Sequence, residues 1–181
     1  MSSIQDLKSV FSKRGGAARQ NRFSLIVSPP ASLGFNFKDL EDMNVLCENC
    51  VLPGRQITTI DYQLLEQSFK IPTGFMNEEV SFTFLLTNDF FAKEVFDRWA
   101  AAVVGFGRYK LKCRESYAGQ ISVFQLMPGD PTMGGLERNV SGIQLQRAFP
   151  TAVSAVTLDN AAENSVQRVT VTVAYENFVI L

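Results

Sequence analysis

The residues best suited to chemistry are three cysteines, two of which form the Cys-x-x-Cys pattern of Cys47 and Cys50. Zinc would need four ligands, but Cys113 is distant in the sequence and histidine is absent. A redox pair needs a helix N-terminus to lower the thiol pKa, whereas this pair lies in a strand-like stretch that predicts side chains on opposite faces. The pattern predicts reduced structural thiols, and an intersubunit disulfide through any of the three stays open.

Other candidate catalytic groups lack partners. Without histidine, the chain has neither the commonest general base nor the commonest metal ligand. The acidic pairs Glu41-Asp42 and Glu78-Glu79 adjoin turn signals, which indicates solvated loops. The glycine-rich stretch 129–135 precedes a predicted strand and not a helix, so it does not predict a phosphate loop. We therefore expect no catalytic, cofactor-binding or metal-binding residues, and no enzyme.

The composition indicates a domain whose surface is partly covered by partners. A length of 181 residues suits one domain, and 46% hydrophobic residues suffice for a core. Charged residues make up 19%, below the roughly one quarter of ordinary soluble proteins. The net charge of −1 gives no long-range attraction for DNA, which argues against a sequence reader but suits a wall past which DNA slides. No apolar run predicts a membrane span, and no secretory signal is seen.

Residues 1–20 are predicted to form an N-terminal arm, and residues 21–181 a single β domain. In the arm, apolar residues share one face of a short helix that Ser2 or Ser3 would cap and Gly15-Gly16 would end; they are Ile4, Leu7, Val10 and Phe11. So short a helix is not stable alone. The arm is therefore either a mobile tail or a segment that docks on a neighbouring subunit.

The domain is predicted to be mainly β, because apolar and polar residues alternate along most of it. The expected strands cover residues 21–27, 45–52, 80–86, 108–113, 120–127, 136–147, 153–158 and 166–175. A break is expected at Phe149-Pro150. The order of elements favours an antiparallel β-sandwich or half-open barrel with one packed helix.

That helix is predicted to follow Asn88-Asp89, with Asn88 as its N-cap and Gly105 at its end. Its apolar residues recur at steps of four and must lie on a sheet: Phe91, Val95, Trp99 and Val103. We expect Phe91, Val95 and Trp99 to support the core.

The segment from Gln56 to Glu79 is unusually apolar for an exposed hairpin. Its clearest turn signal is Pro72-Thr73-Gly74. A monomer seldom exposes such a patch, so the segment is either part of the core or pairs with another copy, where it would hide strand edges and close a ring. For the second case we predict subunit contacts through Phe69, Ile71, Phe75 and Met76.

Several short motifs occur in the order seen in phage tail tube proteins. The C-terminal stretch 149–175 combines FPTAV, VTLD, a polar loop and VQRVTVTVAY, and it resembles the C-terminal signature of that family. Four further motifs resemble other segments of the family: GGAARQNRF over 15–23, VLPG over 51–54, IPTG with VSFTF over 71–84, and FDRW over 96–99. The resemblance covers most of the chain.

The resemblance implies a structural virion protein. Similar proteins form hexameric rings that stack into the inner tube of a contractile tail, with loops and the N-terminal arm binding the next ring. The implied partners are further copies, the sheath outside, and baseplate and tube-terminator proteins at the ends. DNA would pass through the lumen without sequence-specific binding. No cofactor and no membrane insertion are implied, and assembly would occur in the host cytoplasm.

Three other functions stay open at this stage. One is a baseplate tube initiator of the same fold, and another is the tube of a type VI or extracellular injection system. A more distant alternative is a carbohydrate-binding β-sandwich module. Such a module needs an exposed aromatic platform, whereas the single tryptophan lies on the predicted apolar stripe of the helix.

Overall fold

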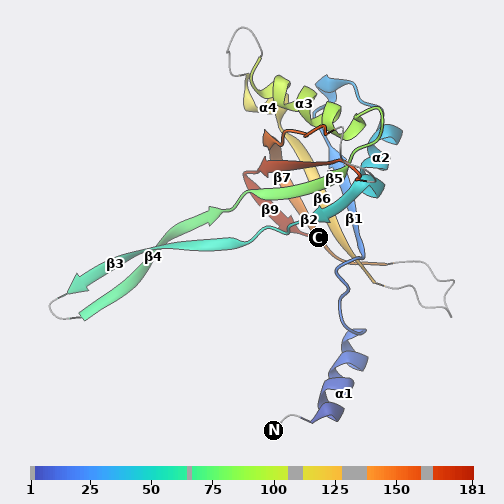
Figure 1. Ribbon diagram of the computed structural model, residues 1–181. Helices are drawn as coiled ribbons and strands as arrows, with labels where there is room; N and C mark the ends of the chain where they lie inside the picture. The colour runs from blue at the N-terminus through green and yellow to red at the C-terminus, as the bar shows by residue number, and fades with distance from the viewer. Residues whose placement is uncertain (1–2, 65–66, 106–111, 128–137, 160–164) are drawn as a thin grey trace.

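Two antiparallel sheets that share one long strand form the body of the protein (Figure 1). The computed structural model describes residues 3–64, 67–105, 112–127, 138–159 and 165–181. One sheet has the order β1-β6-β7-β9 and the other the order β7-β8-β5-β2. Their strands are β1 (Phe23–Ser28), β2 (Cys47–Cys50), β5 (Val80–Leu85), β6 (Gly119–Met127), β7 (Arg138–Val153), β8 (Arg168–Ala174) and β9 (Asn177–Ile180).

Strict alternation of side chains builds the interior of the body. On β5 and β8, three buried residues of one strand pair in register with three of the other: Val80, Phe82 and Phe84 with Val173, Val171 and Val169. On β1 and β6, Leu25 and Val27 are buried beside Ile121 and Val123. Burial of apolar area stabilises the fold by about 25 cal/mol per Å². The mainly β fold with a packed helix is confirmed.

The predicted helix is α3 (Phe91–Val103), which buries its apolar stripe on the body. The predicted N-cap is wrong, because the left-handed residue Phe90 precedes the helix and Asn88 makes no capping bond. Asp89 instead accepts a hydrogen bond from the Phe91 N–H at 3.3 Å. The helix ends at Val103, with Val104 as C-cap, just before Gly105.

The long strand β7 runs straight through the predicted break at Phe149-Pro150. The strand pairs with β6 as far as Ala148 and with β8 from Phe149 onward. Arg147, with a φ of 53°, lies where it passes from one sheet to the other. Pro150 is tolerated because this half of β7 is an edge strand. The strand predicted over 153–158 is wrong, since the described chain has no strand after Val153 until β8, and β9 was not predicted.

A second helix, α2 (Phe37–Leu46), was also not predicted and replaces the start of the strand expected over 45–52. Met43 is its one buried residue, although half of the residues of the helix are apolar. The Asn44 Oδ1 accepts a hydrogen bond from the Leu25 N–H at 2.6 Å, which ties α2 to the outer edge of β1. The strand expected over 108–113 lies largely outside the described residues, as does the glycine-rich stretch 129–135, and Cys113 precedes the short helix α4 (Arg114–Tyr117).

Two elements extend away from the body in Figure 1. The helix α1 (Ile4–Arg14) begins at a capping box of Ser3 and Asp6 and ends at Gly15, whose φ is 79°. The strands β3 (Arg55–Leu64) and β4 (Gln67–Asn77) form a hairpin. A 3₁₀ turn, η1 (Ala31–Leu33), completes the described elements. Among the described helices, none is long and apolar enough to cross a membrane.

Candidate functional site

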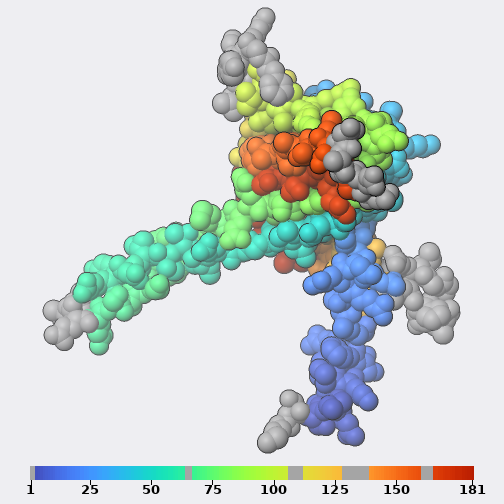
Figure 2. All heavy atoms as spheres, viewed as in Figure 1, coloured from blue at the N-terminus to red at the C-terminus, as the bar shows by residue number. Residues whose placement is uncertain are grey.

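The β3–β4 hairpin projects from the body and carries exposed apolar side chains (Figure 2). Among its described residues none is buried. Large apolar side chains that are between 37% and 63% exposed lie along both strands: Ile57, Ile60, Tyr62, Phe69, Ile71, Phe75 and Met76. A two-stranded ribbon is marginally stable in water, and a patch of this kind marks an interaction site.

The register divides the four predicted contact residues between two faces of the ribbon. Phe69 pairs with Tyr62, and Ile71 pairs with Ile60, so these four side chains share one face of the outer half. The rings of Tyr62 and Phe69 lie 5.4 Å apart between centroids. The structure therefore brings Phe69 and Ile71 together, and it adds Ile60, which the sequence reasoning had not assigned. Ile60 could have been identified only from its position opposite Ile71, and that position is known only once the strand register is known.

The other two predicted contact residues lie nearer the body. Phe75 pairs with Ile57 and Met76 with Gln56, so strand alternation places Phe75 and Met76 on opposite faces. The strand β4 contains one extra residue, Thr73, between Ile71 and Phe75. This residue shifts the alternation of side chains by one position, so Met76 lies on the same face as Phe69 and Ile71.

The predicted turn at Pro72-Thr73-Gly74 is wrong, because these residues form a β-bulge. Thr58 pairs with Gly74 and Thr59 with Pro72, which leaves Thr73 as the extra residue. The Thr73 hydroxyl donates to the Thr58 carbonyl at 3.1 Å. Proline and glycine are common at bulges as well as at turns, so the Pro-Thr-Gly sequence is compatible with either structure. Residues 65–66, which connect the strands, lie outside the described residues.

The base of the hairpin is anchored near the C-terminus. The Arg55 guanidinium lies 4.5 Å from the ring centroid of Phe178 and 5.4 Å from that of Phe75. The Asn77 side-chain amide donates to the Glu176 carbonyl at 2.8 Å. These contacts fix where the hairpin leaves the body, while its outer half extends away from the body (Figure 1).

The predicted helix residues lie in the body and not on the exposed surface. Val95 and Trp99 have 0% exposure, and Phe91 is half-buried. The Trp99 indole N–H donates to the Tyr117 carbonyl at 2.7 Å, which satisfies its polar atom inside the core. A Cβ on Gly119 would lie 2.5 Å from Trp99 Cζ2, so this glycine makes room for the indole.

The paired thiols face the core. A register shift between Cys47 and Asn49 places Cys47 opposite Phe84 and Cys50 opposite Phe82, so the bulge brings both thiols to one face instead of the opposite faces expected. Burial, and then the neighbouring Cys50, raises the pKa of Cys47 to about 12, and burial raises the pKa of Cys50. Both are free thiols. A raised pKa is the reverse of what redox chemistry needs.

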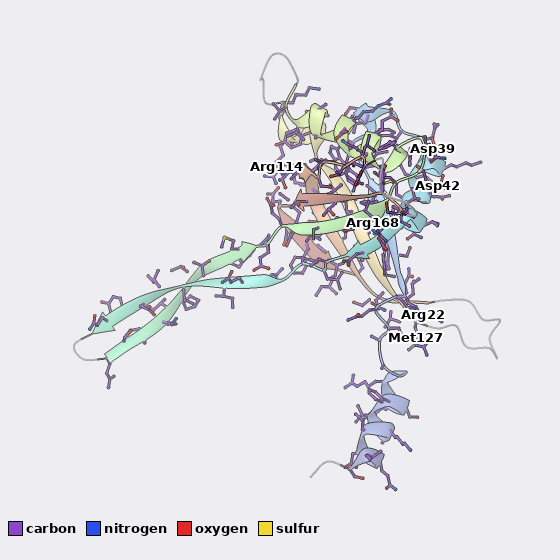
Figure 3. The ribbon with its side chains drawn as sticks, in the orientation of Figure 1. Arg22, Asp39, Asp42, Arg114, Met127 and Arg168 are labelled. Carbon is purple, nitrogen blue, oxygen red and sulfur yellow. The ribbon has the colours of Figure 1, made fainter. Side chains whose placement is uncertain are left out.

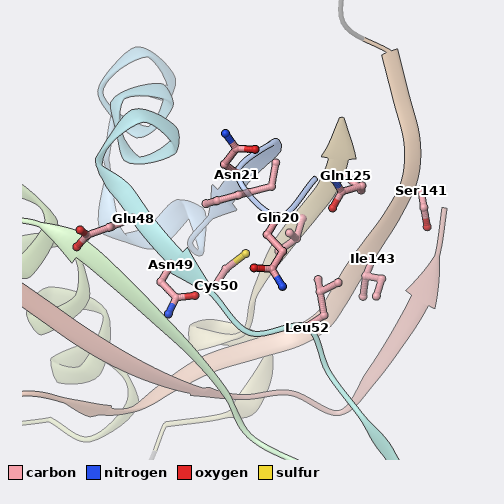
Figure 4. Close-up of a pocket in the computed structure, with 11 residues that line it drawn as sticks. Gln20, Asn21, Glu48, Asn49, Cys50, Leu52, Gln125, Ser141 and Ile143 are labelled. Atoms are coloured by element: carbon pink, nitrogen blue, oxygen red, sulfur yellow. The ribbon is translucent and has the colours of Figure 1, made fainter. Parts of the chain in front are cut away.

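A hollow of about 530 Å³ lies between the two sheets and is bordered by β2 and the start of β1 (Figure 4). That volume suits a small ligand, but two of its polar side chains, Glu48 and Gln125, are already engaged within the chain. The Glu48 carboxylate binds the Arg168 guanidinium, which lowers the Glu48 pKa. The Gln125 amide donates to the carbonyls of Arg19 and Arg22 at 2.8 and 2.9 Å. Within the described residues no cluster suited to a metal ion is found.

The family model described as phage tail tube protein matches residues 18–181. No curated protein sequence matches the chain.

Three solved structures of contractile injection systems share the fold. The sheath-tube complex of an extracellular contractile injection system, PVC, in the extended state contains a chain with TM-score 0.59 and 14% identity, covering 100% of this chain and 99% of that one. The PVC sheath/tube terminator has TM-score 0.61 and 14% identity over 91% and 96% of the two chains. The tube-terminating cap of the anti-feeding prophage has TM-score 0.62 and 13% identity over 91% of each. At these identities the likeness concerns the fold alone.

Proposed function

The chain belongs to the phage tail tube protein family, whose members are structural proteins and not enzymes, and we propose that it forms the hexameric rings of a contractile tail's inner tube. The hairpin is the observation that carries this proposal. Its apolar side chains are exposed in the single chain, and covering them requires a second molecule. In a closed ring, the neighbouring copy would cover the hairpin of each subunit.

The proposed contact combines backbone pairing with an apolar face. The described hairpin strands pair only with each other, so each leaves one edge of N–H and C=O groups unpaired. Such an edge adds readily to a neighbour's sheet. Phe69, Ile71 and Met76 would pack on that neighbour from one face of the ribbon, and Phe75 would pack from the other. A head-to-tail contact between unlike surfaces closes into a ring when the rotation allows it.

The ring is proposed to act as a conduit for DNA in the virion tail. A net charge of −1 lets a polyanion pass without being held by its phosphates. Residues 1–20 would serve as an arm and residues 21–181 as the tube domain. Further copies, a sheath outside, and baseplate and terminator proteins at the tube ends are the proposed partners, with assembly in the host cytoplasm.

A second candidate is a protein that starts or ends the tube. The chains described as terminator and cap have TM-scores of 0.61 and 0.62, close to the 0.59 of the chain from the sheath-tube complex. The fold is therefore common to the tube and to its ends. The two functions differ in polymerisation, because a tube subunit needs two complementary ring faces and an end protein needs one.

Electron microscopy of the purified protein over a range of concentrations tests the proposal. We expect rings with a central hole that grow into long tubes as the concentration rises. Rings that never stack would favour the tube-end protein. A protein that stays monomeric throughout would contradict both functions.

A further inference from the structure

The helix α1 has an apolar face that no described part of the chain covers. Its four apolar residues are between 42% and 74% exposed: Ile4, Leu7, Val10 and Phe11. Helical spacing places Lys8 at one border of this face, since it follows Ile4 by four residues, and places Arg14 on the face itself, since it follows Val10 by four residues and Leu7 by seven. Lys13 lies on the opposite side of the helix. The helix thus presents an apolar stripe with two cations beside it.

A groove of matching character lies between α2 and the start of α3. Its lining includes three carboxylates and no cation, over an apolar floor. The carboxylates belong to Asp39, Asp42 and Asp89, and the floor is made by Val45, Leu46 and Phe91. Val45 is 82% exposed, so α2 leaves this apolar side chain uncovered in the single chain.

The carboxylates of this groove have no cation of their own. None of the three forms an ion pair with a described residue. The Thr87 hydroxyl and then the Phe91 N–H hold the pKa of Asp89 below its ordinary value, so this group is charged at neutral pH. Three like charges around an exposed apolar floor favour a basic, apolar occupant.

The chain's own α1 leaves the body at the far end from this groove. Figure 3 shows Asp39 and Asp42 on α2 at the top, whereas Arg22 and Met127 lie at the base from which α1 extends. The linker is fixed at that base, because the Gln125 amide donates to the carbonyls of Arg19 and Arg22. A second copy, stacked head to tail, would bring its α1 toward the groove.

We propose that α1 of one copy docks in the groove between α2 and α3 of a second copy. Leu7, Phe11 and their neighbours on the stripe would cover Val45 and Phe91, and Lys8 and Arg14 would face the three carboxylates. The inference rests on the proposed function, since stacked copies provide the second chain. Each subunit then has two complementary surfaces, α1 at one end and the groove between α2 and α3 at the other. An open stack requires two such surfaces.

Charge reversal on the full-length protein tests the docking. Lys8→Glu with Arg14→Glu, and separately Asp39→Lys with Asp42→Lys, should each raise the protein concentration needed for stacking by about tenfold or more, because attraction becomes repulsion. Combining all four substitutions in one chain should restore stacking. Controls reverse one charge on other faces, Lys13→Glu on α1 and Glu41→Lys, which lines a different hollow on α2, and each is compared with the single reversal Lys8→Glu or Asp42→Lys, which changes the charge by the same amount. Sedimentation velocity measures the concentration dependence.

Cross-linking separates this inference from the function on which it rests. In a Cys113→Ser background, Phe11→Cys chains are mixed with tagged Val45→Cys chains and treated with a short bifunctional maleimide. We expect cross-links between the two kinds of chain, and far fewer when Lys13→Cys replaces Phe11→Cys. This result supports the docking whether the copies form tubes or dimers.

Three results would overturn the docking. Both reversed variants could stack like the wild type, the four-fold variant could fail to recover, or the cross-link could form within one chain carrying both cysteines. Wild-type protein that shows no rings while the intermolecular cross-link forms would contradict the tube and leave the docking intact.

Discussion

The strands β4 and β5 carry similar side chains but lie in opposite environments. On β5, Phe82 and Phe84 are 1% and 0% exposed, whereas on β4, Phe69 and Ile71 are 48% and 37% exposed. Both strands alternate apolar and polar residues. What differs is the surface that each faces, because β5 pairs with β8 and packs against α3, while the outer half of β4 pairs with β3 in a ribbon that extends away from the body. Alternation therefore fixes which residues share a face, and the partner decides whether that face is buried.

The largest contrast is expected in stability. Trp99→Ala removes a fully buried indole and its hydrogen bond to Tyr117, and it should lower the free energy of unfolding by about 3–5 kcal/mol. Phe69→Ala should change the unfolding free energy of the dissociated subunit by less than about 1.5 kcal/mol, because its half-exposed ring packs on Tyr62 in the ribbon and not in the core. Urea unfolding of both variants measures the difference. Equal losses would contradict the division between body and hairpin.

Two glycines, one in the body and one in the hairpin, allow the packing of the two regions to be compared by adding a methyl group. A Cβ on Gly119 would lie 2.5 Å from Trp99 Cζ2 and 2.6 Å from the Ser28 carbonyl oxygen, so Gly119→Ala should cost about 1–3 kcal/mol. Gly74, at the hairpin bulge, has nothing within 4 Å of such a Cβ. Gly74→Ala should change the stability by less than about 1 kcal/mol. Thermal melting compares the two, and a larger loss at Gly74 would show that the bulge is tightly constrained.

The cysteines should differ in reactivity according to where they lie. At pH 8 the Cys47 thiol, with a pKa of about 12, has almost no thiolate, and Cys50 is also raised by burial. Cys113 is exposed. Titration of native protein with a thiol reagent should therefore show one fast thiol, which Cys113→Ser abolishes, and all three should react in denaturant. Fast labelling of Cys47 in the native protein would show that β2 opens readily.

The smallest effect concerns the exposed ion pair of Glu48 and Arg168. Hydrogen bonding to Arg168 lowers the folded-state pKa of Glu48 below its ordinary 4.5. The pair therefore stabilises the fold above pH 4.5, and this contribution is lost as the pH falls through the lowered value. Glu48→Gln should be slightly less stable than the wild type at pH 7, and the difference should vanish in acid. Chemical unfolding across the pH range measures this difference.

A control for this small effect lies in the hairpin. Asp61 and Lys70 are 4.0 Å apart and well exposed, so Asp61→Asn should leave the stability at pH 7 unchanged. A loss at Asp61 as large as that at Glu48 would mean that the ion pair on the body has no special role.

The parts of the fold that could be predicted are those with a clear period. The residues of β5 and β8 alternate along almost all of their length, and α3 repeats its apolar residues at steps of four, so the pattern predicts both the type of element and its buried face. The helix α2 was missed because its last residues, Val45 and Leu46, were assigned to the strand expected over 45–52, and its one buried residue is Met43. The strand β7 was divided in two because proline reads as a break unless the edge position of Pro150 is known.

The residues of the candidate site could be predicted from the sequence, but their arrangement on the two faces of the hairpin could not. An apolar stretch with no place in the core indicated a contact surface, and Phe69, Ile71, Phe75 and Met76 followed from it. Their division between two faces depends on the bulge at Thr73, which no pattern in β4 distinguishes from a turn. The groove of α2 was missed for a related reason. Its carboxylates come from α2 and from the turn before α3, which meet only in the folded chain.

The most direct measurement compares Phe69→Asp with Ser68→Asp by sedimentation velocity. The two substitutions add the same charge to adjacent residues of β4, but Phe69 lies on the apolar face and Ser68, paired with Gln63, on the other. We expect Phe69→Asp to stay monomeric at concentrations where the wild type assembles, and Ser68→Asp to assemble. Both should unfold like the wild type. Assembly of Phe69→Asp at the wild-type concentration would contradict the claim that this face of the hairpin joins the subunits.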